Sequence, residues 1–302
     1  MRALLLEPFQ APYLQRALIE AVLLGVLAGV VGVHVVLRQL SFVADTFTHT
    51  VFPGLAIAFA LGGSLFLGAL AAGLVSAVTF TLLDRNRRIT SDAALAVVLT
   101  SFFALGVVVI SRTERYTADL TGLLFGRILT VDRAQILETA VVLVLVLAVV
   151  AATHKELVLR AFSPASAEAL GYRVGALDLL TNVLVVLVVV AAARSVGTLL
   201  TVALLIVPAA TAKLVCRSVA QMYVVAAAAG ALGGWLGLAA SYEASITYDL
   251  RLASGATVVL TLVALFVLVL AGRRVTIVIA RRSHRASDEP SRPLPAEGSV
   301  AT

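Results

Sequence analysis

Cysteine and charged residues are scarce in this sequence, and both shortages limit what the chain can be. Cys216 is the single cysteine among 302 residues, which excludes an intrachain disulfide and a cysteine-based metal site. Charged residues make up 13% of the chain and hydrophobic residues 61%, and the mean hydropathy is +1.04, far more apolar than a soluble domain. Because the apolar runs are long enough to cross a bilayer as helices, we predict an all-α polytopic membrane protein.

Several functional motifs are also absent. The sequence has no G-x-x-x-x-G-K-[ST], so we expect no nucleotide to bind in a P-loop. It has no H-E-x-x-H and no Ser/His/Asp pattern of an intramembrane hydrolase, so we do not expect an enzyme. Proton- or sodium-coupled transporters usually carry coupling groups in both halves of their internal repeat. In this chain, the predicted spans of the second half contain almost no carboxylates. Any transport energy should therefore come from another subunit.

Alternating apolar and polar segments predict about nine membrane spans, or eight if one short segment is re-entrant. The predicted spans cover residues 14–37, 42–61, 65–83, 93–110, 134–152, 174–193, 198–212, 220–240 and 253–272. We assign residues 1–283 to one transmembrane domain. Residues 284–302 are polar and proline-rich, so we expect a disordered cytoplasmic tail.

The formal net charge of +6 comes from arginines that cluster in particular loops. Loops rich in arginine stay in the cytoplasm, so residues 85–88 and 273–285 should mark that side of the membrane. The second cluster should contact the headgroups of anionic membrane lipid. Because the positive charge is explained by membrane orientation, we expect no nucleic acid partner.

The segment SFVADTFTHTVFPG, residues 41–54, places ionisable residues inside the second predicted span. Asp45 and His49 lie four residues apart, so a helix presents them on one face as two ligands for a small divalent cation. Pro53 has no amide hydrogen, so the carbonyl of His49 loses its helical partner and the helix should be broken. Ionisable residues within a span are costly, which favours a metal site. The alternative is a core histidine bonded to Asp45 beside a simple kink.

A second candidate site lies in the predicted cytoplasmic loop formed by residues 154–173. Ser163 and Pro164 are typical of a helix start, and Gly171 is typical of a helix end. We therefore predict a short helix over residues 165–170. The alternative is an ordinary interfacial loop.

Five segments of the chain together resemble one known family. They are LRQLSFVADTFTHTVFPGLAIAFALG (residues 37–62), SDAALAVVLTSFFALGVVVIS (91–111), DLTGLLFGRIL (119–129), RSVGTLLTVALLIVPAATAKL (194–214) and SGATVVL (254–260). In these segments the chain is similar to the metal-ion ABC importer permeases, which take up manganese, zinc or iron with a separate ATPase and a binding protein. The resemblance runs over residues 14–272.

This resemblance implies an ABC importer permease fold and a homodimer in the bacterial plasma (inner) membrane. It implies two further partners, an ATP-binding cassette ATPase subunit that hydrolyses ATP and an extracytoplasmic metal-binding protein. The divalent metal (Mn²⁺, Zn²⁺ or Fe²⁺) is then transported cargo, and no cofactor is bound covalently. The family's membrane metal site maps onto Asp45 and His49. Thr48 stands where the family usually has serine, and Ala253 where it usually has proline, which leaves the metal preference open.

The resemblance also gives the short cytoplasmic helix a role. Glu168 to Gly171, EALG, loosely resembles the E-A-A…G signature of ABC importer coupling loops. The coupling residues would then be Ser163, Pro164, Glu168 and Gly171, on a helix that docks in a groove of the ATPase.

Two other functions remain open from the sequence. One is a permease of the siderophore or cobalamin class, which moves large ligands through a wide channel; the Asp45 and His49 pair argues against it. The other is a secondary ion transporter that works without an ATPase.

Overall fold

The computed structural model describes residues 11–86, 88–111, 128–193, 195–247 and 252–287. These residues form helices without strands, and nine of the helical segments are long and apolar enough to cross a membrane. This confirms the predicted all-α, multi-span class. Residue 87 of the first arginine cluster, residues 119–127 of one matching segment, residue 194 and residues 288–302 of the predicted tail lie outside the described ranges.

The observed helices follow the predicted spans closely. They are α2 (Pro12–Leu37), α3 (Ser41–Thr50), α4 (Phe52–Ala60), α5 (Leu65–Asp84), α6 (Ser91–Ile110), η2 (Ile128–Thr130), α8 (Arg133–Ala152), α9 (His154–Phe162), α10 (Pro164–Ala169), α11 (Val174–Ala193), α12 (Gly197–Val215), α13 (Val219–Thr247) and α14 (Ser254–Ser287). Helices α3 and α4 together make up the second span.

Three boundaries were predicted wrongly. The predicted span ended at residue 240, yet α13 continues to Thr247, whose hydroxyl donates to Glu243 Oε1 at 2.9 Å. The predicted last span ended at Gly272, but α14 continues to Ser287, and residues 273–287 contain no proline or glycine. The basic residues that follow Gly272 therefore lie on the helix. The predicted span began at residue 93, but α6 begins at Ser91, and the Thr90 hydroxyl caps it by accepting from the Ala93 amide.

Helix α2 lies at the centre of one group of helices. Of its most apolar 18-residue window, 72% is buried, against 17% for the corresponding part of α14. Glycines permit its close approach to α13, because a Cβ added to Gly25 would lie 2.5 Å from the backbone carbon of Gly230. The two helices therefore pack backbone against backbone.

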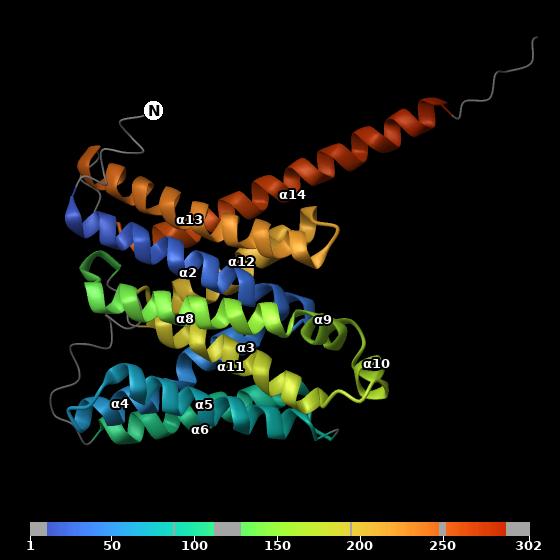
Figure 1. Ribbon diagram of the computed structural model, residues 1–302. Helices are drawn as coiled ribbons and strands as arrows, with labels where there is room; N and C mark the ends of the chain where they lie inside the picture. Colours follow the sequence, from blue (N-terminus) through green and yellow to red (C-terminus); the bar gives the residue numbers. More distant parts are fainter. Residues whose placement is uncertain (1–10, 87, 112–127, 194, 248–251, 288–302) are drawn as a thin grey trace, which may run out of the picture.

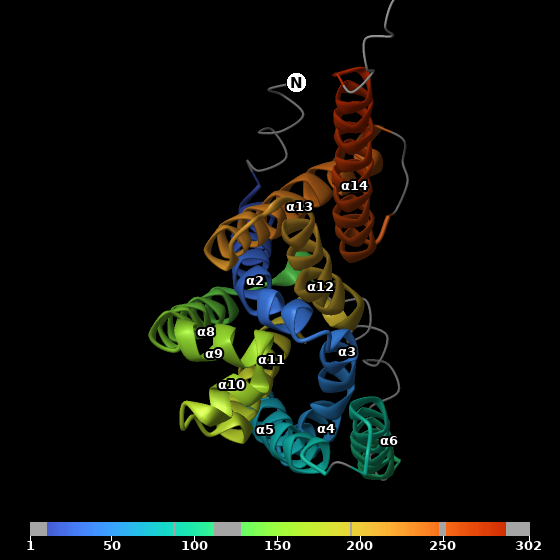
Figure 2. The ribbon, with the colours of Figure 1, turned by 90° about the vertical axis from the view of Figure 1, so that its right-hand side faces the viewer.

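Figures 1 and 2 show a second group formed by α4, α5 and α6 on the opposite side of the molecule. Helices α3 and α11 lie between this group and the group of α2, α12, α13 and α14. The short helices α9 and α10 lie at one end of the bundle (Figure 1). The second span thus begins beside the central helix and ends in the outer group.

Candidate functional site

The second span is divided in the structure, as the position of Pro53 predicts. Helix α3 ends at Thr50, Val51 is the junction, and α4 begins at Phe52. Pro53 lies in the first turn of α4, where its missing amide hydrogen is tolerated. The helix of the second span is therefore interrupted two residues beyond His49, at Val51.

Asp45 and His49 come together on one face of α3. Asp45 Oδ1 lies 3.8 Å from His49 Nε2, and the two side chains are 50% and 32% exposed. This separation is too long for a hydrogen bond. A cation bonded to each atom at about 2.0–2.2 Å fits between two ligands this far apart. A core histidine bonded to Asp45 does not describe this arrangement, because neither side chain is buried.

His49 borders a cavity of about 370 Å³ with largely apolar walls. The rings of His49 and Phe103 meet edge to face with 5.9 Å between their centroids. The cavity is lined by Thr48, His49, Val51, Phe52, Leu55, Phe103, Val107, Ile110, Ala193 and Thr198. These residues come from α3, α4, α6 and both sides of the turn between α11 and α12, so the histidine faces a space bounded by several helices.

One chain places two candidate metal ligands here, Asp45 and His49. Among the described residues, no group of three or more His, Cys, Asp or Glu side chains could hold a metal ion. Since four or more ligands are usual for divalent metals, the remaining coordination positions are left to other donors.

The predicted short helix is present at the end of the bundle. Ser163 Oγ accepts from the Ser166 amide at 3.2 Å and so caps α10, and Gly171 adopts φ = +84° after its end. The structure starts the helix at Pro164 and ends it at Ala169, one residue earlier at each end than predicted. Glu168 is exposed, and Phe162 and Leu170 are 68% and 69% exposed. The exposed surface at α10 thus combines Glu168 with two large apolar side chains that lie on either side of the helix in the sequence.

A buried ionic cluster near α10 was missed by the sequence analysis. Asp178 Oδ1 lies 2.8 Å from Arg38 Nη2 and 2.9 Å from Arg160 Nε, and Arg160 Nη2 donates to Asp178 Oδ2 at 3.0 Å. The three side chains are 5%, 17% and 9% exposed for Arg38, Arg160 and Asp178. Burial lowers the pKa of the Arg38 guanidinium, and the Asp178 carboxylate opposes that shift. The available signal was Asp178 itself, a carboxylate inside an apolar span.

Glu20 is a second buried carboxylate that sequence analysis did not single out. Its Oε1 accepts hydrogen bonds of 2.9 Å from Thr139 of α8 and from Ser195 in the turn between α11 and α12. This turn joins Ala193 and Thr198, which line the His49 cavity. Glu20 therefore connects the central helix to a wall of that cavity.

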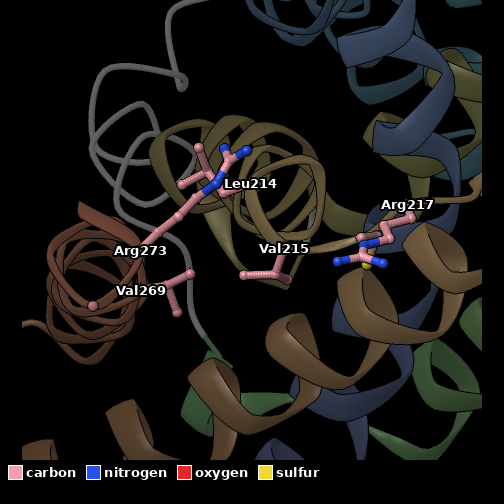
Figure 3. A pocket seen from close by; sticks show the side chains of 7 residues that line it. Leu214, Val215, Arg217, Val269 and Arg273 are labelled. Atoms are coloured by element: carbon pink, nitrogen blue, oxygen red, sulfur yellow. The ribbon is translucent and has the colours of Figure 1, made fainter. Parts of the chain in front are cut away.

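A second hollow lies between α12 and α14, near the end of α12. It has a volume of about 530 Å³ and is lined by Leu214, Val215, Cys216, Arg217, Val269, Gly272 and Arg273. Figure 3 shows the Arg273 side chain extending from α14 toward Leu214 of α12. The groove combines apolar walls with two guanidinium groups.

Comparison with known proteins gives consistent matches over most of the chain. The manganese import system permease protein ScaB of Streptococcus gordonii is 40% identical over 254 residues, which cover 84% of this chain and 89% of ScaB. The chelated iron transport system membrane protein YfeD of Yersinia pestis is 33% identical over 241 residues, 80% of this chain and 81% of YfeD. The structure of PsaBC from Streptococcus pneumoniae in complex with Fab matches with a TM-score of 0.77 and 36% identity, covering 89% of this chain and 95% of that one.

The family assignment rests on a match that reaches into every described spanning helix. Residues 10–273 match the ABC 3 transport family, which confirms the resemblance drawn from the five sequence segments. Since that range contains α3, the cavity and α10, the candidate sites lie inside the matched region. The chain belongs to the ABC 3 transport family.

Proposed function

We propose that this chain is the membrane-spanning permease subunit of an ATP-driven importer of divalent metal ions, and that the ion passes by Asp45 and His49. The chain is a multi-pass protein of the bacterial plasma membrane. The observation that carries the proposal is the half-exposed Asp45 and His49 pair, which stands beside a helix break and a cavity. Relatives named for manganese import and for chelated iron transport support a metal cargo.

The chemistry of the pair suits a small divalent cation. Asp45 offers a carboxylate oxygen that offsets part of the ion's charge, and His49 offers a neutral imidazole nitrogen. Mn²⁺, Zn²⁺ and Fe²⁺ all accept mixed nitrogen and oxygen ligands, so the ligand types alone do not select one of them.

A homodimer would complete the coordination. Each chain supplies two ligands, and both side chains are partly open in the isolated subunit. If two copies face each other across a two-fold axis at α3, the same surface on both contributes, and four ligands surround one ion. We therefore place the cargo path at the interface of two copies.

Energy and cargo would come from two other partners. The described residues and the sequence motifs offer no P-loop, so a separate ATPase must supply the driving force. Its docking site is the exposed surface of α10, with Ser163 and Pro164 at its start, Glu168 on its surface and Gly171 at its end. An extracytoplasmic metal-binding protein would deliver the ion at the other end of the bundle.

The groove of Figure 3 suits membrane lipid. Its apolar walls fit an acyl chain, while Arg217 and Arg273 fit the phosphate of an anionic headgroup. Lys213 is exposed in the last turn of the neighbouring helix α12 and adds to the positive charge.

The function is tested by removing the ligand pair. Asp45→Ala and His49→Ala should each abolish Mn²⁺ uptake by the assembled transporter in liposomes while leaving membrane insertion and dimerisation intact, because removing an ionisable side chain from a membrane helix does not hinder its insertion. Asp92→Ala is the matched control, since Asp92 is an exposed acid in the first turn of α6. Normal uptake by the Asp45/His49 double variant at matched expression would contradict the proposal and favour a siderophore-type permease.

A further inference from the structure

The Arg38, Asp178 and Arg160 cluster joins three helices that are separate in sequence. Arg38 directly follows α2, Arg160 is on α9, and Asp178 is in the second turn of α11. Arg160 donates one hydrogen bond to Asp178, from Nη2 to Oδ2, while Arg38 Nη2 and Arg160 Nε lie 2.8 and 2.9 Å from Oδ1 as ion-pair contacts without hydrogen-bond geometry, so the carboxylate lies between both cations.

The contact between Arg160 and Asp178 links the helix before α10 to the helix after it. Arg160 lies four residues before Pro164, and the Ser163 amide donates to the Leu159 carbonyl at 2.9 Å, so α9 leads into α10 with a single residue between them. Asp178 follows α10 along the chain, on the helix that α10 leads into. The ion pair between Arg160 and Asp178 therefore closes the segment that contains α10 at its two ends.

On the other side, the cluster reaches the helix that carries the ligand pair. Arg38 is separated from the start of α3 at Ser41 by two residues. These residues form a tight turn, in which Gln39 has φ = +59° and the Leu40 amide donates to the Val35 carbonyl at 3.2 Å. A turn with its own hydrogen bonds transmits displacement better than a loose loop, so Arg38 and α3 should move together.

We infer that Asp178 is a positioning residue of the transport cycle, which links the coupling helix α10 to α3 by holding Arg160 and Arg38 at the same time. The inference rests on the proposed roles of α10 and of Asp45 and His49. A displacement of α10 by the ATPase moves Arg160 and Asp178 together. Arg38 follows Asp178, and α3 changes its position relative to α4 at the Val51 junction. The ligand pair thereby gains or loses access to the cavity.

The burial of the cluster is what makes it suitable for this task. Exposed ion pairs exchange partners with water and hold a geometry weakly, whereas these three side chains are at most 17% exposed. Energetic coupling between distant sites needs a contiguous set of contacts with defined arrangements. The cluster supplies that continuity between the end of the bundle and the ligand-bearing helix.

The test uses the complete transporter, with ATPase and binding protein, in liposomes, and Mn²⁺ as the transported ion. Arg160→Gln should lower the Mn²⁺ taken up per ATP hydrolysed by roughly 2- to 30-fold, the range that residues along a coupling network produce. ATPase should still co-purify, and Mn²⁺ affinity of the permease should be unchanged. Arg160→Lys keeps the charge but loses the second contact, so its coupling should lie between wild type and Arg160→Gln. Lys155→Gln, an exposed cation on the same helix α9, is the matched control and should couple normally.

Comparing the two single variants with the double variant shows whether Arg38 and Arg160 act through one link or independently. Arg38→Gln should give a similar loss, and the variant with both changes should lose no more than either single change, because both break one link. A normal coupling ratio in Arg160→Gln, an equal loss in Lys155→Gln, or losses that multiply in the double variant would overturn the inference. Release of the ATPase by Arg160→Gln would also overturn it, since the cluster would then only support α10. Failure of the proposed docking role is detected separately, because Glu168→Arg would then leave ATPase assembly unchanged.

Discussion

Two sets of ionisable residues in this molecule differ in their exposure and in the contacts that their side chains make. Asp45 and His49 stand 3.8 Å apart and are 50% and 32% exposed, with neither satisfying the other. Asp178 lies within 3.0 Å of a guanidinium nitrogen of Arg38 and of Arg160, and all three side chains are largely buried. The first pair keeps its ligand atoms available, whereas the second set uses them within the protein. Ionisable residues in a membrane bundle can thus serve binding or connection, and exposure distinguishes the two.

The largest expected effect comes from breaking the buried set. Asp178→Leu leaves two guanidinium groups without their shared carboxylate, which should lower the free energy of unfolding by about 3–5 kcal/mol. Asp45→Leu should change the free energy of unfolding by no more than about 0.5 kcal/mol, since Asp45 is half exposed and lies 3.8 Å from His49, too far for a hydrogen bond. Thermal unfolding in lipid nanodiscs measures both. Equal destabilisation by the two changes would remove the distinction between the sets.

A smaller effect is expected at α10, which should act on assembly and not on metal binding. Gly171→Val places a β-branched residue at φ = +84°, which costs about 1–2 kcal/mol and should weaken ATPase binding roughly 5- to 30-fold. Glu168→Arg should weaken it by changing the charge of the docking surface. Co-purification of the ATPase and Mn²⁺ binding by the permease are measured in parallel. Loss of Mn²⁺ binding in either variant would show that α10 and the ligand pair are not separate sites.

The smallest change tests the orientation of both sets in the membrane. In a Cys216→Ser background, Arg88→Cys should react with a membrane-impermeant thiol reagent from the cytoplasm only, and Ser245→Cys from outside only. Both positions are exposed, the first between α5 and α6 and the second near the end of α13. Uptake should be nearly normal in both variants. Labelling of Arg88→Cys from outside would invert the predicted topology.

The sequence was sufficient for most of the fold because membrane spans are specified by local composition. The spans and the break near Pro53 follow from apolar runs and from one missing amide hydrogen. Helix ends were harder where polar residues continue a helix, as residues 241–247 do in α13. Polarity marks the edge of the membrane, but a helix ends only where its backbone is capped or broken.

The candidate ligand pair was also visible in the sequence, since its two members lie on one helix. The ionic cluster was not, because Arg38, Arg160 and Asp178 meet only after three helices have packed. No local pattern specifies which arginine a buried aspartate will contact. The role of Asp45, His49 and α10 in transport remains a prediction that the experiments above test.

The buried carboxylate of Glu20 has a consequence for how the protein is made. Its partners Thr139 and Ser195 lie 119 and 175 residues later in the chain. During synthesis α2 is made well before residues 139 and 195, and also before Gly230, against which Gly25 packs. Until those later residues are inserted, the Glu20 carboxyl group of α2 lacks these hydrogen-bond donors and Gly25 lacks its packing partner. The packing around α2 is therefore completed only when residues from the last third of the chain have been inserted.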